Sequence, residues 1–296
     1  QREGKRRERE PAVALYSLAH VASTLEQVQA MPYGRSFEPH PAVMVRFQDA
    51  GHILGSAIVE LWLADGHGGT RKLVASGDLG QPGRPILRDP TPIADADVLL
   101  IESTYGDRIH APNSLLDELA DALTRLSARG GVAVVPVFAV GRAQTLLHAI
   151  AQLKAQGRIP AHLPVYLDSP MAVSATQLFG EHMGAHRLGR DELEAMARGT
   201  TLVHTAEESK ALSRLHGPRV ILSASGMATG GRVLHHLALH PGDHRNLIVL
   251  TGHQSPGTRG ARLAAGEKSI RIHGQDVAIR AEVVQLSSAS AHADAA

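Results

Sequence analysis

Four strand-like apolar runs each lead into a histidine or a carboxylate that lies beside glycine or other small residues. These are His52, Asp78, Glu102 and His292. Side chains at the C-terminal edge of a sheet can converge from distant parts of the sequence, and small neighbours let a ligand approach the backbone. Because the chain has no cysteine, a metal here would be bound by imidazoles and carboxylates, which suit Zn²⁺ or Mn²⁺. The pattern predicts a metal or phosphate site, although each residue alone is also typical of a turn or a cap.

The elements that carry these residues begin with a β-rich segment. Ser17 is a candidate cap for a helix over residues 17–30, which Met31-Pro32-Tyr33-Gly34 would end. Strands are expected over residues 43–47, 56–63, 72–75 and 97–101. The prolines of residues 81–96 predict a loop there.

From residue 113 onward, helices and strands alternate. Asn113 is a candidate cap for a helix that ends at Gly130-Gly131. Further strands are expected over 132–138, 164–167, 201–204, 219–223 and 247–251, and further helices over 141–156, 170–180, 206–215 and 230–239. This alternation predicts a parallel, doubly wound sheet. Residues 269–286 return to a hairpin pattern through Gly274, so the order of segments indicates one domain inserted into another.

Composition excludes several classes of protein. The 296 residues carry 30 Lys and Arg against 29 Asp and Glu, so polyanion binding would need a local patch. The 43% hydrophobic content argues against disorder, and no apolar run is long enough for a membrane span. With one Trp, four Tyr and four Phe, platforms for base stacking are scarce. The charged residues 1–10 read as a solvated helix face or frayed arm, with nucleic-acid binding as the alternative. A cytoplasmic location is expected.

Seven sequence strings carry a family resemblance. They are Asp49–Ala57, Ser76–Gly80, Ile101–Asp107, Phe138–Gln144, Leu167–Ala172, Ser225–Arg232 and Ser290–Asp294. In this order they resemble the metallo-β-lactamase/β-CASP nucleases, which include bacterial RNA-processing enzymes and the endonuclease subunit of the eukaryotic cleavage-and-polyadenylation machinery. The resemblance implies an α/β fold, in which an incomplete αββα sandwich is interrupted by a Rossmann-like β-CASP domain. The implied division is 1–108 and 269–296 for the sandwich and 109–268 for the insert.

The resemblance also implies a two-zinc phosphodiesterase acting on RNA. By this resemblance His52 is a ligand of one zinc, Asp78 bridges both, and Glu102 and His292 form a pair beside the scissile phosphate. Water activated by zinc would attack phosphorus in line. Protonated His292 would donate to the leaving 3′ oxygen, and Glu102 would hold it and keep it cationic.

Further residues are expected to contact the RNA backbone. Arg142 stands at a predicted helix start, where its guanidinium would match phosphate oxygens. Thr229, Gly230, Gly231 and Arg232 would open another helix, whose free amides suit a phosphate as well as an ordinary cap. Ser290 belongs to the Ser-Ala-His string and is also expected to contact phosphate. Recognition of the backbone is favoured over base stacking.

The family's His-x-His-x-Asp-His signature does not occur in this sequence. We expect it upstream of Gln1, and the last zinc histidine downstream of Ala296, so that the chain is a piece truncated at both ends. Two ligands, His52 and Asp78, do not complete a four-coordinate zinc site. The chain alone is therefore expected to bind zinc poorly and to be inactive, and the full-length protein to be active.

Alternative functions stay open at this point. One is a non-catalytic RNA-binding relative, another is a DNA nuclease of the same superfamily, and a third is a small-molecule hydrolase, which the long insert disfavours. The pairs His182/His186 and His236/His240 have the spacing of half a helical zinc site but are expected to be exposed helix faces. RNA is the expected partner, a membrane is not, and a homodimer is one assembly left open.

Overall fold

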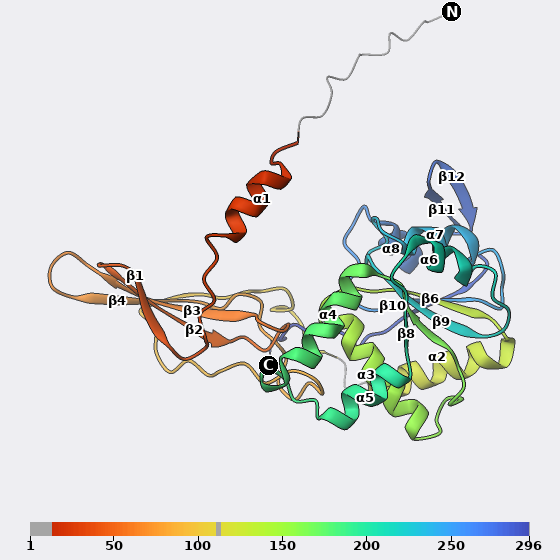
Figure 1. The fold of residues 1–296 in the computed structure, drawn as a ribbon, viewed down its shortest axis with the longest axis horizontal. Helices are drawn as coiled ribbons and strands as arrows, with labels where there is room; N and C mark the ends of the chain where they lie inside the picture. Colours follow the sequence, from red (N-terminus) through yellow and green to blue (C-terminus); the bar gives the residue numbers. More distant parts are fainter. Residues whose placement is uncertain (1–13, 111–113, 296) are drawn as a thin grey trace, which may run out of the picture.

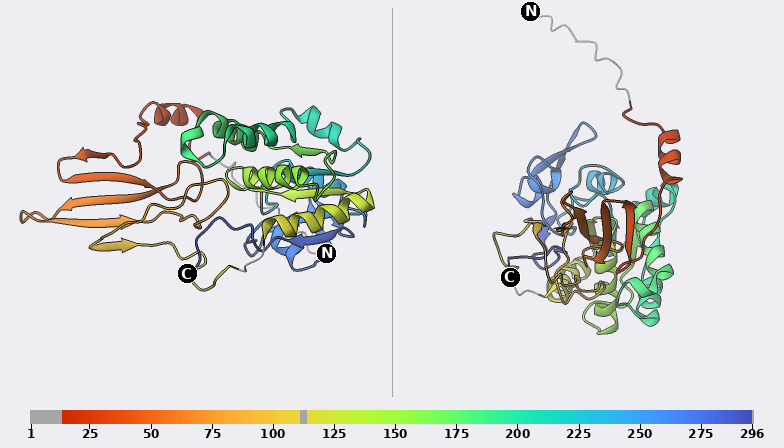
Figure 2. Two further views of the ribbon diagram at one scale, coloured as in Figure 1. Left: turned by 90° about the horizontal axis from the view of Figure 1, so that it is seen from below. Right: turned by 90° about the vertical axis from the view of Figure 1, so that its left-hand side faces the viewer.

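The computed structural model describes residues 14–110 and 114–295, which form two bodies joined end to end (Figure 1). One body is a five-stranded sheet with little around it, and the other is a six-stranded sheet with helices on both faces (Figure 2). The expected α/β class is thereby confirmed. The charged residues 1–10 and the cap Asn113 lie outside the described residues. Within the described residues, none of the helices combines the length and apolar character needed to cross a membrane.

The five-stranded sheet runs in sequence order. Its strands are β1 (Ser36–His40), β2 (Val43–Asp49), β3 (Ala57–Ala64), β4 (Thr70–Ala75) and β5 (Val98–Leu100). β1 to β4 are antiparallel, and β5 pairs in parallel with β4. The predicted strands are confirmed to within two residues at each end. β1 was not predicted because Pro39 interrupts its pattern, which an edge strand tolerates.

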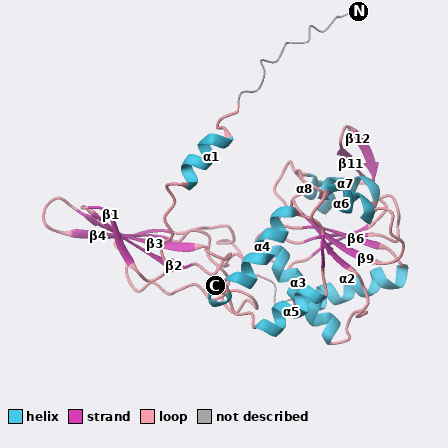
Figure 3. Cartoon of the chain, in the orientation of Figure 1, coloured by secondary structure: helices cyan, strands magenta, loops and turns pink. Residues whose placement is uncertain are grey.

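This sheet buries few apolar side chains. Its one hydrophobic cluster consists of Ala50, Ile58 and Val74, with Leu79 and Ile93 packed against them. The helix α1 (Leu18–Leu25) has no buried residue and projects away from the sheet (Figure 3). The predicted cap Ser17 is confirmed, but the helix ends at Leu25 and does not extend to residue 30.

The six-stranded sheet is entirely parallel, as the alternation predicted. Its order is β13 (Glu282–Gln285), β10 (Leu247–Leu250), β6 (Val132–Pro136), β9 (Arg219–Ser223), β7 (Val165–Leu167) and β8 (Thr201–Leu202). The central strands are buried on both faces, which is why they read as continuous apolar runs in the sequence.

Alternate residues of these strands face two separate hydrophobic clusters. Val135 and Leu222 join the cluster of α2 (Leu115–Arg129), α3 (Arg142–Ala155), α4 (Pro170–Glu181) and α5 (Arg190–Arg198). Val134 and Ile221 join the cluster of α6 (Ala206–Leu212), α7 (Val233–Leu239), α8 (Arg259–Ala264) and the hairpin of β11 (Ser269–Ile272) and β12 (Gln275–Ala278). A short 3₁₀ helix, Met183–Ala185, follows α4.

Several predicted boundaries are corrected here. The helix expected from residue 230 begins at Val233, and the strands expected to residues 138 and 204 end at 136 and 202. α5 and α8 were not predicted. The segment 269–286 is not one hairpin, because β13 leaves it and pairs with β10. The chain therefore returns toward the five-stranded sheet only after Gln285, and not at residue 269 as the sequence suggested.

Candidate functional site

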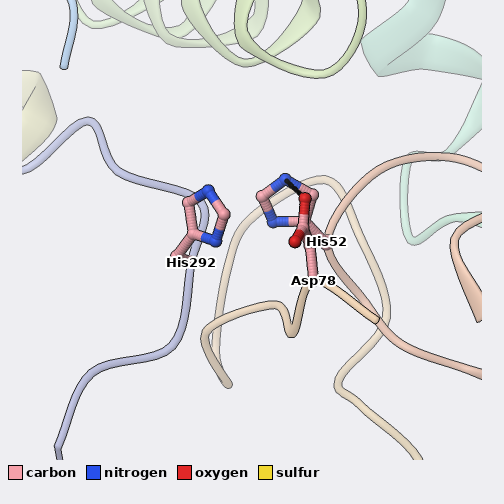
Figure 4. Close-up of side chains that lie close together, drawn as sticks. All are labelled: His52, Asp78 and His292. Carbon is pink, nitrogen blue, oxygen red and sulfur yellow. Dashed lines mark ion pairs between the residues drawn. The ribbon is translucent and has the colours of Figure 1, made fainter. Parts of the chain in front are cut away.

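His52, Asp78 and His292 meet where the two bodies join (Figure 4). Each of the three side chains offers one possible ligand atom, a ring nitrogen or a carboxylate oxygen, and these three atoms lie within 4.8 Å of one another. His52 Nε2 is 4.0 Å from Asp78 Oδ2, and the rings of His52 and His292 are 4.3 Å apart between centroids. The expected convergence of residues 52 to 292 is therefore present in the structure.

Glycines allow the loops of the site to approach closely. A Cβ atom on Gly80 would lie 1.9 Å from the carbonyl oxygen of Gly51, so no larger residue fits at position 80 without movement. Gly51 itself has a positive φ of 66°. Gly80 also forms a β-bridge with His292, so the returning chain is fixed directly beside the loop that carries Asp78.

Glu102 orients His292. His292 Nδ1 lies 3.0 Å from Glu102 Oε2, and the backbone amide of Leu79 donates to the other carboxylate oxygen. Burial raises the pKa of Glu102, but hydrogen bonds from Thr104, Leu79 and His292 outweigh it, so the net pKa is lowered and the group stays ionised. The predicted pair is thus in contact, with the carboxylate in the ionised form that accepts a hydrogen bond from Nδ1–H.

His52 has the properties of a metal ligand. Its side chain is 13% exposed, and Nδ1 is buried without a hydrogen-bond partner. Burial, followed by the nearby charge of His292, lowers the pKa of His52 and favours the neutral ring that binds metals. Two imidazoles and one carboxylate fit Zn²⁺ or Mn²⁺ and leave coordination positions open. His292 lies within reach of the same point, but its Nδ1 is engaged by Glu102, and an Nε2 bound to a metal would have no proton to donate, so metal binding by His292 is an alternative to its general-acid role.

A cleft of about 560 Å³ lies beside these residues and is lined by both bodies. Arg142 and Ser290 line it together with His52, Asp78 and His292. Burial, reinforced by the charge of Arg84, lowers the pKa of Arg142 to about 10. In the described part of the chain Arg142 has no carboxylate partner within 4.0 Å, and its guanidinium donates to the carbonyl of Thr251. Its positive charge is therefore available to an anion in the cleft.

The segment from Thr229 to Arg232 does not join this cleft. The amides of Thr229 and Gly230 donate to Ser225 Oγ at 3.0 and 3.2 Å. The guanidinium of Arg232 forms an ion pair with Asp168 at 2.8 Å. The helix that follows has only seven residues and starts at Val233. These amides and this guanidinium are already occupied, so the geometry gives no support to a phosphate site here.

The histidine pairs expected on exposed helix faces are partly buried instead. His236 is 2% exposed and its Nε2 lies 2.6 Å from the buried carboxylate of Asp168. His186 is 4% exposed and its Nε2 lies 2.7 Å from the carbonyl oxygen of Phe179. The prediction of solvent exposure is wrong for both residues, because each ring satisfies a polar group in the interior.

Sequence reasoning missed several residues that line the cleft, among them Tyr105, Phe138, Met171, Met227 and His253. Tyr105 and Phe138 stand inside strings that carried the family resemblance, yet nothing in their spacing distinguished them from core aromatics. The ring of Tyr105 lies 6.1 Å from that of His292. Met171 and Met227 also stand inside strings that carried the resemblance, whereas His253 had no local signal.

Comparison with known proteins gives the family. The Beta-Casp domain model matches residues 143–263. Ribonuclease TTHA0252 of Thermus thermophilus is 41% identical over 261 residues, which cover 85% of this chain and 58% of that protein. An RNase J-like protein of Methanocaldococcus jannaschii is 31% identical over 94% of this chain and 65% of its own length.

The transcription termination factor FttA of Methanosarcina mazei is 30% identical over 94% of this chain and 46% of its own length. The chain thus spans between about half and two thirds of the length of these relatives. It belongs to the β-CASP family of metallo-β-lactamase-fold proteins.

Proposed function

We propose that this chain carries the catalytic cleft of a metal-dependent ribonuclease, which hydrolyses phosphodiester bonds of RNA in the full-length protein. The observation that carries the proposal is the meeting of His52, Asp78, Glu102 and His292 beside one cleft. The names of two relatives, a ribonuclease and an RNase J-like protein, point to the same reaction. RNA processing in the cytoplasm follows as the proposed setting.

His52 and Asp78 would hold the metal, which we propose to be zinc, with two ions in the complete site. When bound, these ions would supply Lewis-acid activation of water and neutralise charge on the phosphate. The described residues offer fewer donors than two ions need, so the remaining ligands would come from outside residues 14–110 and 114–295.

His292 would act as the general acid. Its Nδ1 is engaged by the ionised Glu102, so Nε2 is the nitrogen left to deliver a proton to the leaving 3′ oxygen. The carboxylate fixes the ring orientation and stabilises the imidazolium before the transfer. Arg142 and Ser290 would contact the phosphate oxygens in the same cleft, which places the guanidinium charge beside the reacting group.

We also propose a division in which residues 1–108 and the chain after Gln285 belong to the metallo-β-lactamase-like domain. The intervening residues form the β-CASP domain. The pairing of β13 with β10 is what moves the second boundary from residue 269.

The test is single-turnover cleavage of a 5′-labelled single-stranded RNA by the full-length protein, with and without a chelator. Cleavage is expected to stop on chelation, to return with added Zn²⁺, and to be lost in Asp78→Asn. The exposed Asp191→Asn serves as the matched control. Cleavage that survives the chelator, or RNA binding with no cleavage under any metal, contradicts the proposal, and the latter outcome favours the non-catalytic relative. A parallel DNA substrate separates ribonuclease from DNA nuclease.

A further inference from the structure

The wall that the α/β body contributes to the cleft is largely apolar. Phe138 follows β6, Met171 lies in the first turn of α4, and Met227 lies in the loop after β9. His52 and Asp78 line the same cavity from the five-stranded sheet. The five-stranded body therefore contributes the metal-binding groups, and the α/β body contributes mainly apolar groups together with Arg142. Its volume of about 560 Å³ is within the range of sites that enclose small ligands.

Phe138 is more exposed to solvent than the other three phenylalanines. Its side chain is 41% exposed, whereas Phe37 and Phe47 are half-buried against each other and Phe179 is fully buried. Met171 beside it is 67% exposed. Large apolar side chains that line a cavity together, and remain accessible there, indicate a surface that binds a ligand.

The backbone around Phe138 holds the ring in place. The amide of Val137 donates to the carbonyl of Ser223, and the carbonyl of Phe138 accepts from the amide of Ala143, at 3.0 and 3.2 Å. Gly226 lies so close that a Cβ atom there would be 2.8 Å from Phe138 Cδ2. The backbone that carries the ring is thus fixed by hydrogen bonds, and the ring lies close to Gly226 of the neighbouring loop.

We propose that Phe138, flanked by Met171 and Met227, is a stacking platform for a nucleobase next to the scissile phosphate of single-stranded RNA. This inference rests on the proposed function, because it assigns the apolar side chains of the cleft to the base and leaves Arg142 and the His52, Asp78 and His292 cluster to the phosphate. Every base offers a π-face to an aromatic ring, and methionine side chains pack well at the edges of such rings. A base inside a duplex is already paired and stacked, so the platform selects unpaired RNA.

The proposal amends the expectation that recognition of the RNA backbone is favoured over base stacking. That expectation came from the small number of aromatic residues, but their number matters less than their placement. Two of them, Tyr105 and Phe138, line the cleft.

The test measures the affinity of the full-length protein for a fluorescent single-stranded RNA by anisotropy, in chelator so that no cleavage occurs. The same RNA is then prepared with one abasic ribose at each position around the cleavage site. Three variants are compared with the wild type, namely Phe138→Leu, Phe138→Tyr and the matched control Phe37→Leu, which removes a ring outside the cleft. Thermal unfolding of each variant confirms that it is folded.

At one abasic position the wild type is expected to lose about tenfold in affinity, the size of one base–aromatic stack. Phe138→Leu is expected to bind intact RNA about tenfold more weakly than the wild type. Removing the base at that position should not weaken the binding of this variant any further. Phe138→Tyr and Phe37→Leu keep the wild-type affinity. If Phe138→Leu binds intact RNA as tightly as the wild type, or loses equally with every abasic RNA, the stacking inference is overturned while the proposed function stands. A wild-type protein that binds no RNA overturns both.

Discussion

The two sheets of this chain are stabilised by different interactions. The six-stranded sheet lies between two hydrophobic clusters, and strand residues such as Leu222 and Ile221 are completely buried. The five-stranded sheet has a cluster of only three buried residues, and the strand Val98–Leu100 at its edge has side chains that are 43–57% exposed. The six-stranded sheet is thus covered on both faces by hydrophobic clusters. Among the described residues, the five-stranded sheet has much less apolar cover.

In the five-stranded sheet, ion pairs and cation–π contacts contribute part of the stabilisation that apolar packing gives the six-stranded sheet. Glu60, whose side chain is 1% exposed, pairs with Arg46 at 2.7 Å and with Lys72 at 2.9 Å. Both cations also lie over the ring of Trp62, at 5.0 and 5.2 Å from its centroid. Three of the four converging residues, His52, Asp78 and Glu102, follow strands of this thinly packed sheet. Within residues 14–110 and 114–295, these three residues therefore lie beside the sheet with fewer buried apolar side chains, and the α/β body supplies the other wall of the cleft.

The largest expected effect concerns the residue that returns from the α/β body to the site. His292→Gln should lower the single-turnover cleavage rate of the full-length protein by about 10²- to 10⁴-fold, because the general acid is lost. His244→Gln, at a side chain that is 86% exposed, is the matched control. A rate within threefold of the wild type in His292→Gln would show that this imidazole is not the proton donor.

Matched truncations compare the cores of the two sheets directly. Leu222→Ala in β9 should lower the free energy of unfolding by about 3 kcal/mol, since it leaves a cavity in a fully packed interior. Leu73→Ala in β4 should cost about 1 kcal/mol, because this half-buried side chain leaves less of a void. Urea unfolding of both variants measures the difference. Equal losses would mean that the two sheets are packed alike.

The sequence was sufficient to predict most of the elements and the four converging residues, although β1, α5 and α8 were missed. Apolar runs define strands, and His52, Asp78 and Glu102 follow strands whose C-terminal ends share one edge of the five-stranded sheet, whereas His292 follows a strand of the other sheet. The two arginines Arg142 and Arg232 show where this reasoning fails. Both stood at predicted helix starts, but only Arg142 faces the cleft, while Arg232 pairs with Asp168, 64 positions away. No local pattern separates a free guanidinium from one that a distant carboxylate neutralises.

The cleft wall and the position of β13 were unpredictable for the same reason. Phe138, Met171 and Met227 come together only where two bodies meet, so their shared surface is a tertiary property. The pair Val283 and Val284 indicates a strand, but a strand of this kind fits either sheet, and its parallel pairing with β10 depends on which edge is available.

Acid should remove the polar support of the five-stranded sheet. Hydrogen bonding to Arg46 is the main cause that lowers the pKa of Glu60 from 4.5 to about 2. A lowered pKa in the folded state means that the stabilisation is fully present above pH 4.5 and is lost as the pH falls toward 2. Glu60→Gln should therefore cost on the order of 2–3 kcal/mol at pH 7, with a penalty that shrinks below pH 4.5.

The free energy of unfolding of both proteins, measured by urea titration between pH 7 and pH 3, gives this difference. Glu38→Gln, on an exposed residue of β1, is the control and should change stability by less than about 0.5 kcal/mol at every pH. A Glu60→Gln penalty that stays constant over this range would exclude the ionised carboxylate as its source.

The smallest expected effect concerns the link between the two bodies. Glu118 of α2 accepts hydrogen bonds from the amides and hydroxyls of Ser287 and Ser288, just before the loop that carries His292. Burial raises the pKa of Glu118, but these hydrogen bonds outweigh it and keep the carboxylate ionised. Because an amide offers only one acceptor oxygen, Glu118→Gln should loosen the loop and lower the cleavage rate by about tenfold, far less than His292→Gln.

A positioning role predicts more than a loss of rate. Hydrogen exchange of the amides in residues 287–293 should become faster in Glu118→Gln, while the melting temperature stays near that of the wild type. Glu207→Gln, on an exposed residue of α6, is the matched control. If the rate falls only in proportion to a general loss of stability, Glu118 is part of the scaffold of the α/β body and does not position the catalytic loop. A selective effect on the loop would mean that Glu118 of the α/β body positions His292 in a site whose proposed metal ligands, His52 and Asp78, follow strands of the five-stranded sheet.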